Sequence, residues 1–277
     1  MTQFKTIKLF VSHMVAFTKL HGLGNDFVII DKNELPIDCT IQNFATNIAN
    51  RRTGIGCDQV IFYQKKAGYY EMLIYNNDGS SAKLCGNASR CLAKLIYFDS
   101  GERQIKLKVD NRELLCEVIS DNEISVNVGE VQFNKDWMPA IETLWPVAEL
   151  YMIDLKEIIC ADVGNPHLII FSDISDQDKD LVGERLQNLF PDGVNVNFAS
   201  VKNNKIYLSV WERGAGLTLA CGSGACASFA SARKLGFITD NCEVEFQLGT
   251  LKMSKNGADI IMTGPASLVA HGEFIYG

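Results

Sequence analysis

The sequence of 277 residues lacks the features that mark several large classes of protein. No apolar run approaches the roughly 20 residues of a transmembrane helix, so we expect no membrane partner. Basic residues are not in excess, and the formal net charge of −7 disfavours nucleic acid as a partner. There is no phosphate-binding loop, and Gly22-x-Gly24 is too short for a dinucleotide fingerprint.

The nine cysteines lack the spacing of a metal site or a redox pair. No Cys-x-x-Cys motif occurs, and the separations of Cys85 from Cys91 and of Cys221 from Cys226 are wider than in structural zinc knuckles, so no metal is predicted. An odd number of cysteines without a clear secretory signal indicates free thiols in a reducing cytoplasm. Four are expected to be small buried apolar residues: Cys39, Cys116, Cys160 and Cys242.

The N-terminal segment is expected to lie outside the fold. Lys5 and Lys8 precede a short apolar stretch, but no small-residue cleavage site follows it. An extension over residues 1–14 is therefore favoured over a signal peptide. Apolar residues make up 47% of the chain, which is ample for a sizeable core.

What the sequence does contain is an internal repeat. Four short motifs recur in the same order at offsets between 135 and 140 residues, and this predicts two similar lobes over residues 15–128 and 129–266. The matched segments are 24–30 with 164–170, 54–60 with 193–199, 75–79 with 210–214, and 85–87 with 221–223.

Each repeat combines several strand patterns with two helix patterns. Apolar residues recur at helical spacing in residues 41–50 and 181–189, and a second helix is expected over 88–97 and 225–235. Strands are expected at 27–30, 59–63, 70–75, 105–109, 114–119, 124–128, 168–171, 205–211, 244–248 and 260–263. Many strands around few helices predict the α+β class, with mostly antiparallel sheets in two pseudo-symmetric lobes.

Two equivalent cysteines, Cys85 and Cys221, are the candidate catalytic residues. Each begins a Cys-Gly-polar turn that opens a helix, where unpaired N–H groups and the helix dipole favour a thiolate and lower a thiol pKa. Two such thiols facing one another suit racemisation or epimerisation at an α-carbon, because one group removes a proton from one face and the other delivers a proton to the opposite face.

Polar residues at the other repeated turns are candidate substrate-binding groups. Arg213 is suited to pair bidentately with a carboxylate, and Glu212 with an ammonium group. The alternative for these two is a surface ion pair, and for the asparagines simple turn chemistry. The remaining candidates are Asn25, Gln59, Asn76, Asn165 and Asn195, with His167 as a residue that lines the site.

These motifs resemble the diaminopimelate epimerase family from about residue 17 onward. The segments that carry the resemblance are 21–27, 54–59, 76–80, 85–91, 164–167, 212–216 and 220–227, of which the block around Cys221 is the most specific.

The resemblance implies epimerisation of LL-2,6-diaminopimelate to its meso form without pyridoxal phosphate, metal or other cofactor, in cytoplasmic lysine and peptidoglycan synthesis. It also implies a cleft between the lobes, a last strand over 267–277 that returns to the first lobe, and backbone donors at Gly86, Asn87, Gly222 and Ser223.

The chain departs from the family pattern at three positions. Cys57 stands where a small or apolar residue is usual, Ala88 replaces a glycine, and Leu217 replaces a glutamate. Two other readings remain open: a racemase or isomerase of the same fold acting on another amino acid such as proline, and a non-catalytic amino-acid-binding protein. The sequence also leaves open whether the chain forms a homodimer.

Overall fold

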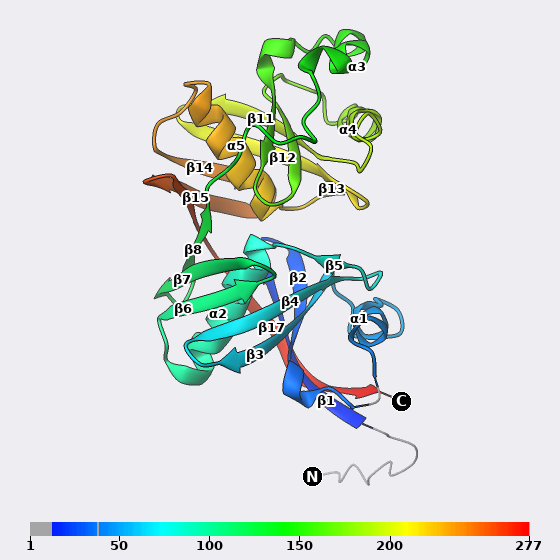
Figure 1. Ribbon diagram of the computed structural model, residues 1–277, viewed down its shortest axis with the longest axis vertical. Helices are drawn as coiled ribbons and strands as arrows, with labels where there is room; N and C mark the ends of the chain where they lie inside the picture. The colour runs from blue at the N-terminus through cyan, green and yellow to red at the C-terminus, as the bar shows by residue number, and fades with distance from the viewer. Residues whose placement is uncertain (1–12, 38, 277) are drawn as a thin grey trace.

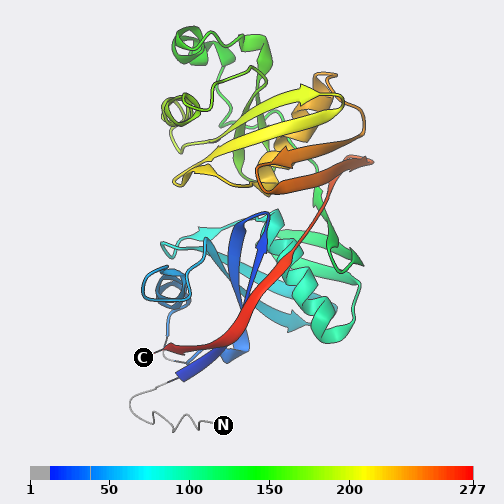
Figure 2. The same ribbon diagram turned by 180° about the vertical axis from the view of Figure 1, so that it is seen from behind.

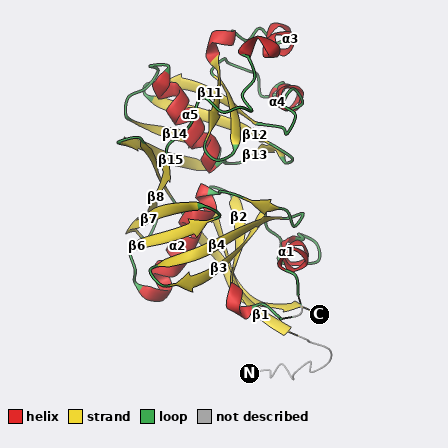
Figure 3. Ribbon diagram, in the orientation of Figure 1, coloured by secondary structure: helices red, strands yellow, loops and turns green. Residues whose placement is uncertain are grey.

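The computed structural model describes residues 13–37 and 39–276, which form two lobes stacked along the long axis of the molecule (Figure 1). Most of the expected N-terminal extension lies outside the described residues, and the first strand begins at His13. Strands dominate both lobes and helices are few (Figure 3), which confirms the α+β class. No helix in the described part of the chain is both long and apolar enough to cross a membrane.

The first lobe is a twisted sheet around one buried helix. β2 and β3 are parallel, whereas β1 with β2 and β3 with β4 are antiparallel. Buried and exposed residues alternate along β6, as expected where one face of a strand covers a core. In chain order the elements are β1 (His13–Gly22), β2 (Asn25–Asp31), α1 (Ile41–Ala49), β3 (Gln59–Lys66), β4 (Tyr69–Asn76), β5 (Ser81–Ala82), α2 (Gly86–Ser100), β6 (Gln104–Val109), β7 (Arg112–Ser120) and β8 (Glu123–Gly129).

The second lobe repeats this arrangement. β10 and β11 are parallel, as β2 and β3 are, and β12 follows antiparallel to β11. A short helix, α3, precedes the repeated unit. The elements are α3 (Trp145–Leu150), β9 (Ile158–Asp162), β10 (Pro166–Ile170), α4 (Lys179–Gln187), β11 (Asn195–Lys202), β12 (Lys205–Glu212), β13 (Gly216–Thr218), α5 (Gly222–Lys234), β14 (Asn241–Phe246), β15 (Gly249–Asn256) and β16 (Asp259–Gly264).

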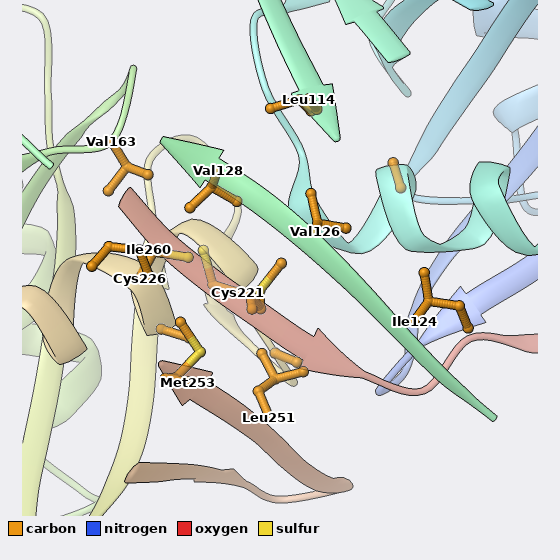
Figure 4. Close-up of a cluster of buried hydrophobic side chains, with 14 of the residues drawn as sticks. Leu114, Ile124, Val126, Val128, Val163, Cys221, Cys226, Leu251, Met253 and Ile260 are labelled. Carbon is orange, nitrogen blue, oxygen red and sulfur yellow. The ribbon is translucent and has the colours of Figure 1, made fainter. Parts of the chain in front are cut away.

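Two pairings join the lobes. β8 pairs antiparallel with β16, and their side chains share one apolar cluster that includes Val126 and Ile260 (Figure 4). The chain then returns to the first lobe as β17 (Ser267–Tyr276), which pairs along the whole length of β1 (Figure 2). The lobes are therefore joined by a common apolar core and by the return of the last strand to the first lobe.

The central helices α2 and α5 are buried on almost every side over their first turns. Small residues such as Ala225, Ala227 and Ala230 on α5 allow the surrounding strands to approach closely. Helix α2 ends at Gly101, whose φ of 75° lies in the left-handed region that favours glycine. Each central helix begins at the boundary between the lobes, which places its N-terminus at the site described below.

The strand registers align the lobes and correct two of the sequence matches. Phe27 lies opposite Gln59, and His167 lies opposite Asn195, so Gln59 corresponds to Asn195. Asn76 lies opposite Gln59 and therefore corresponds to Glu212. The match of residues 54–60 to 193–199 was wrong by three positions, and that of 75–79 to 210–214 by one. The loops that precede β3 and β11, residues 50–58 and 188–194, differ in length, so their glycines do not align.

Candidate active site

A cavity of about 670 Å³ lies between the lobes and is lined by both. Every candidate site residue lines it except His167, which lies behind the wall. From the first lobe come Asn25, Gln59, Asn76, Cys85, Gly86 and Asn87, and from the second come Asn165, Asn195, Glu212, Arg213, Cys221, Gly222 and Ser223.

Cys85 and Cys221 hold the same position in their two lobes. Each is the N-cap of a central helix, with extended backbone and a sulfur that accepts from the third residue of the helix. The distance from Ala88 N to Cys85 Sγ is 3.5 Å, and that from Gly224 N to Cys221 Sγ is 3.4 Å. The sulfur of Cys221 also lies 3.4 Å from Ser223 Oγ. The expected helix-capping thiols are present in both lobes.

The glycine after each cysteine allows the two helix N-termini to converge. A Cβ on Gly86 would lie 2.3 Å from Met262 Cε, and a Cβ on Gly222 would lie 3.0 Å from Asn87 Oδ1. The sulfur of Met262 would in turn lie 3.4 Å from that Cβ of Gly222. Met262, on β16, therefore packs against the start of both helices, and a side chain at either glycine would require Met262 or Asn87 to shift.

Burial changes the electrostatics expected at these thiols. Removal from water raises the pKa of Cys85 to about 12 and raises the pKa of Cys221 well above its usual value. The N–H groups of the helices oppose this, and the nearby Glu212 carboxyl adds to it. The lowered thiol pKa expected from the helix position alone is therefore wrong for this structure. A thiolate formed in such a site is a strong base.

In the first lobe, amide side chains of the cavity wall form two hydrogen-bonded pairs. Gln59 Nε2 donates to Asn76 Oδ1 at 2.9 Å, and Asn87 Nδ2 donates to Asn25 Oδ1 at 3.2 Å. Cys85 Sγ lies 3.9 Å from the same Asn25 oxygen. The buried Oε1 of Gln59 accepts no hydrogen bond within the described part of the chain. A buried acceptor of this kind is suited to an ammonium group.

The wall from the second lobe carries charge. Burial raises the pKa of Glu212, whose carboxylate accepts from Thr218 Oγ1 at 2.5 Å. Arg213 is exposed at the rim. Its backbone N–H donates to Asn195 Oδ1 at 3.0 Å, and its side-chain Nη1 donates to Asp192 O at 2.8 Å. The guanidinium keeps further donors for a carboxylate.

His167 supports the wall from behind. Its side chain is fully buried, and burial lowers its pKa to about 4, so the ring is neutral. Asn197 Nδ2 lies 3.0 Å from Nδ1, which leaves Nε2 as the donor toward Ser223 Oγ at 3.0 Å and Asn165 Oδ1 at 3.2 Å. His167 therefore orients two cavity residues without lining the cavity itself.

Three charged residues of the cavity wall, Arg51, Asp58 and Asp78, were not among the candidates. Arg51 Nη2 lies 2.7 Å from Asp26 Oδ1 and 2.7 Å from Asp58 Oδ1, and Asp58 Oδ2 accepts from Asn25 Nδ2 at 2.9 Å. Arg51 and Asp58 line the cavity, and Asp58 fixes the orientation of Asn25. The sequence contains a signal for the two aspartates that Arg51 contacts: Asp26 directly follows Asn25, and Asp58 directly precedes Gln59, both inside repeated turns.

The three departures from the family pattern are accommodated. Cys57 is fully buried in an apolar cluster beneath β2 and β3. Ala88 lies inside helix α2 with no left-handed backbone, so an alanine suits its conformation. Leu217 lies on β13 at the cavity, 38% exposed.

The two-lobed α+β fold, with one central helix in each lobe, defines a fold class that solved structures share. A predicted epimerase from Pseudomonas aeruginosa shares the fold, with a TM-score of 0.73, 15% identity, and coverage of 95% of this chain and 100% of that one. A hydroxyproline epimerase from Agrobacterium vitis, solved with trans-4-OH-L-proline, has a TM-score of 0.67, 11% identity, and coverage of 95% and 91%.

The sequence narrows the class to one family. Residues 17–134 and 159–269 match the diaminopimelate epimerase family, and the chain belongs to it. A relative from Rickettsia felis, named diaminopimelate epimerase, is 60% identical over 262 residues, which cover 94% of this chain and 97% of the relative.

Proposed function

We propose that the chain converts LL-2,6-diaminopimelate to meso-diaminopimelate by proton transfer between Cys85 and Cys221. The observation that carries this proposal is the pair of equivalent helix-capping thiols in one cavity between duplicated lobes. The name of the Rickettsia felis relative supports the choice of substrate. The substrate is a free small molecule, and we place the reaction in the cytoplasm.

Each turnover moves one proton off the substrate and one onto it. The thiolate of one cysteine removes the α-proton and becomes a thiol, while the thiol of the other delivers its proton to the opposite face and becomes a thiolate. The reverse reaction exchanges these roles. The high thiol pKa helps here, because the α-proton of an amino acid is very weakly acidic and needs a strong base.

The N-termini of helices α2 and α5 stabilise the carbanion. The N–H groups at Gly86, Asn87, Gly222 and Ser223 lie at the starts of the two helices and can bind the carboxylate next to the reacting carbon, where negative charge accumulates. These donors are already oriented before the reaction, so no reorganisation is needed as the charge develops.

The distal end of the substrate is assigned to the charged wall of the second lobe. Arg213 receives the distal carboxylate, and Glu212 with the surrounding amides receives an ammonium group. Groups placed to bind a substrate are left unpaired by an analogue that lacks the matching atoms. Lysine and 2-aminopimelate should therefore react far more slowly than diaminopimelate.

One assay separates this function from its alternatives. The protein is incubated with LL-diaminopimelate in D₂O, and the product is analysed for chirality and for deuterium at the α-carbon. Meso product with deuterium supports the proposal. Exchange with proline but not with diaminopimelate would assign the site to a racemase of another amino acid, and binding without exchange would assign it to a non-catalytic binding protein.

A further inference from the structure

Arg90, on helix α2, is a buried cation that the proposed reaction does not use. Its side chain is fully buried, and no carboxylate of the described residues lies within salt-bridge distance of it. A charge buried without a counter-charge is costly, so a protein that keeps one commonly gains something from it.

The guanidinium contacts three different segments. Its Nη2 donates to Asn87 Oδ1 at 2.9 Å, its Nε donates to Pro265 O at 3.3 Å, and its Nη1 lies 3.4 Å from Met262 Sδ. Pro265 belongs to the segment that carries the chain from β16 back to β17. Arg90 therefore ties the start of α2 to the strand and the segment that join the lobes.

Two partners of Arg90, Asn87 and Met262, also contact residues beside the two cysteines. Asn87 donates on to Asn25 Oδ1, the oxygen beside Cys85 Sγ. Met262 packs against Gly86 and Gly222, the residues that follow the two cysteines. A single fixed group thus reaches both helix N-termini through neighbouring side chains, although it comes from the first lobe alone.

We propose that Arg90 is a positioning residue for this reaction: it holds Asn87 and Met262 so that the two thiol-bearing helix ends face each other, and it adds one unbalanced positive charge beneath them. The proposal rests on the proposed function. The equivalent position in the second lobe is Cys226, which is buried and apolar, so this charge is supplied only once.

Burial makes the Cys85 thiolate a strong base but disfavours its formation, and the charge of Arg90 favours its formation. Burial raises the pKa of Cys85 to about 12, and Glu212 from β12 adds to this, whereas Arg90 lowers it. Cys221 on α5 is subject to the same burial, to Glu212 and to Cys85. Arg90 is thus a cation that favours anions at this depth: the Cys85 thiolate, and the carbanion that the substrate becomes when a thiolate removes its α-proton.

Lys94 offers a matched control on the same helix. It is also nearly buried, and its Nζ donates to Ala266 O at 2.6 Å, so it clamps the same returning segment one turn further along α2. The structure records no hydrogen bond from Lys94 to Asn87 or Met262. Loss of Lys94 removes a comparable clamp while leaving the contacts at the helix ends in place.

The first test compares Arg90→Lys, Arg90→Gln and Lys94→Gln by the pH profile of kcat/KM. Both Arg90 variants should lose about 100-fold in kcat, because reacting groups are misplaced. The ascending limb should move up by about one pH unit in Arg90→Gln, which lacks the charge, and stay in place in Arg90→Lys. Lys94→Gln should show neither change. Equal limb shifts in Arg90→Gln and Lys94→Gln, or unchanged kcat in Arg90→Gln, would overturn the proposal.

A double-mutant cycle tests whether Arg90 acts through Asn87. The double variant Arg90→Lys with Asn87→Ala should be about as slow as Asn87→Ala alone, since the second substitution removes the link that the first disturbs. Independent losses that multiply would contradict the link.

Gly22→Ala perturbs the same contact from outside, for use if the Arg90 variants fail to fold. Its new Cβ would lie 3.0 Å from Arg90 Nη2 and 3.3 Å from Asn87 Cβ, while the backbone there tolerates alanine. A folded Gly22→Ala protein should lose about tenfold in kcat, and unchanged turnover would overturn the proposal. Failure of the wild-type protein to form meso product would instead count against the proposed function itself.

Discussion

The two lobes share one frame but carry different chemistry on it. Their acid–base groups and helix N-termini are equivalent, since Cys85 corresponds to Cys221 and Gly86 to Gly222. Their walls differ, because the amide of Asn76 stands where the second lobe has the carboxylate of Glu212. Duplication thus supplies the symmetry that a two-sided proton transfer needs, and later divergence supplies the asymmetry that distinguishes the two ends of a substrate.

The supports behind the two walls differ as well. In the first lobe Asn25 is held by ionised groups, with Asp58 and Asp26 bridged by Arg51. In the second lobe the equivalent Asn165 is held by the neutral, fully buried His167. One lobe relies on an ion network and the other on a neutral hydrogen-bonded network, and these respond differently to acid.

The largest expected effect tests the equivalence of the cysteines. Cys85→Ala and Cys221→Ala should each lower kcat by at least about 10³-fold, because each removes one of two acid–base groups. Steady-state turnover of LL-diaminopimelate measures both. The buried Cys91→Ala serves as the control and should retain activity within about twofold. Near-normal turnover in either single variant would show that one lobe can act without the other.

A smaller effect should follow from changing the charged wall. Arg213→Lys keeps the charge but loses the planar fork, and we expect kcat/KM for diaminopimelate to fall by about 10–100-fold. Asn77 occupies the corresponding position of the first lobe and also lines the cavity, so Asn77→Ala is the matched variant and should cost less. A larger loss in Asn77→Ala would place the distal end in the first lobe.

The smallest effect concerns stability in acid and separates the two supports. Unfolded His167 binds a proton near pH 6.5, whereas the folded ring stays neutral down to about pH 4, so the unfolded state takes up more protons between these values. The free energy of unfolding should therefore fall by up to about 3 kcal/mol as the pH drops from 6.5 to 4.

The contact of Asp26 with Arg51 in the first lobe should persist over that range. Burial works against ionised Asp26, but hydrogen bonds from Arg51 and Lys19 outweigh it and hold the pKa of Asp26 below 3.8. His167→Phe gives the second lobe the residue that the first has at Phe27 and should flatten the pH dependence. Urea unfolding at pH 7, 5.5 and 4.5 measures this, and equal losses in both proteins would exclude His167 as the cause.

Sequence patterns predicted the helices α1, α2, α4 and α5 but not α3, and they did not record how burial modifies the candidate site. The candidate cavity residues were identifiable because each lies in a repeated turn, whereas Arg51 lies outside these turns. Strand β11 was not expected, since Asn195 and Asn197 interrupt its apolar residues, and its pairing with β10 and β12 decides its conformation. The direction of the thiol pKa was wrong because burial depends on how the lobes close over Cys85 and Cys221, which neither motif records. The contact of Arg51 with Asp26 depends on the fold in the same way.

The pairing of β1 with β17 sets the order in which the protein can be completed on the ribosome. His13 can pair with Tyr276 only after Tyr276 has been translated, so the pairing of β1 with β17 forms after every strand of the second lobe has been translated. At about 5–20 residues per second this delay amounts to some tens of seconds. The lobe that is translated first is therefore finished last, and until then its edge strand has to be kept from pairing with other chains.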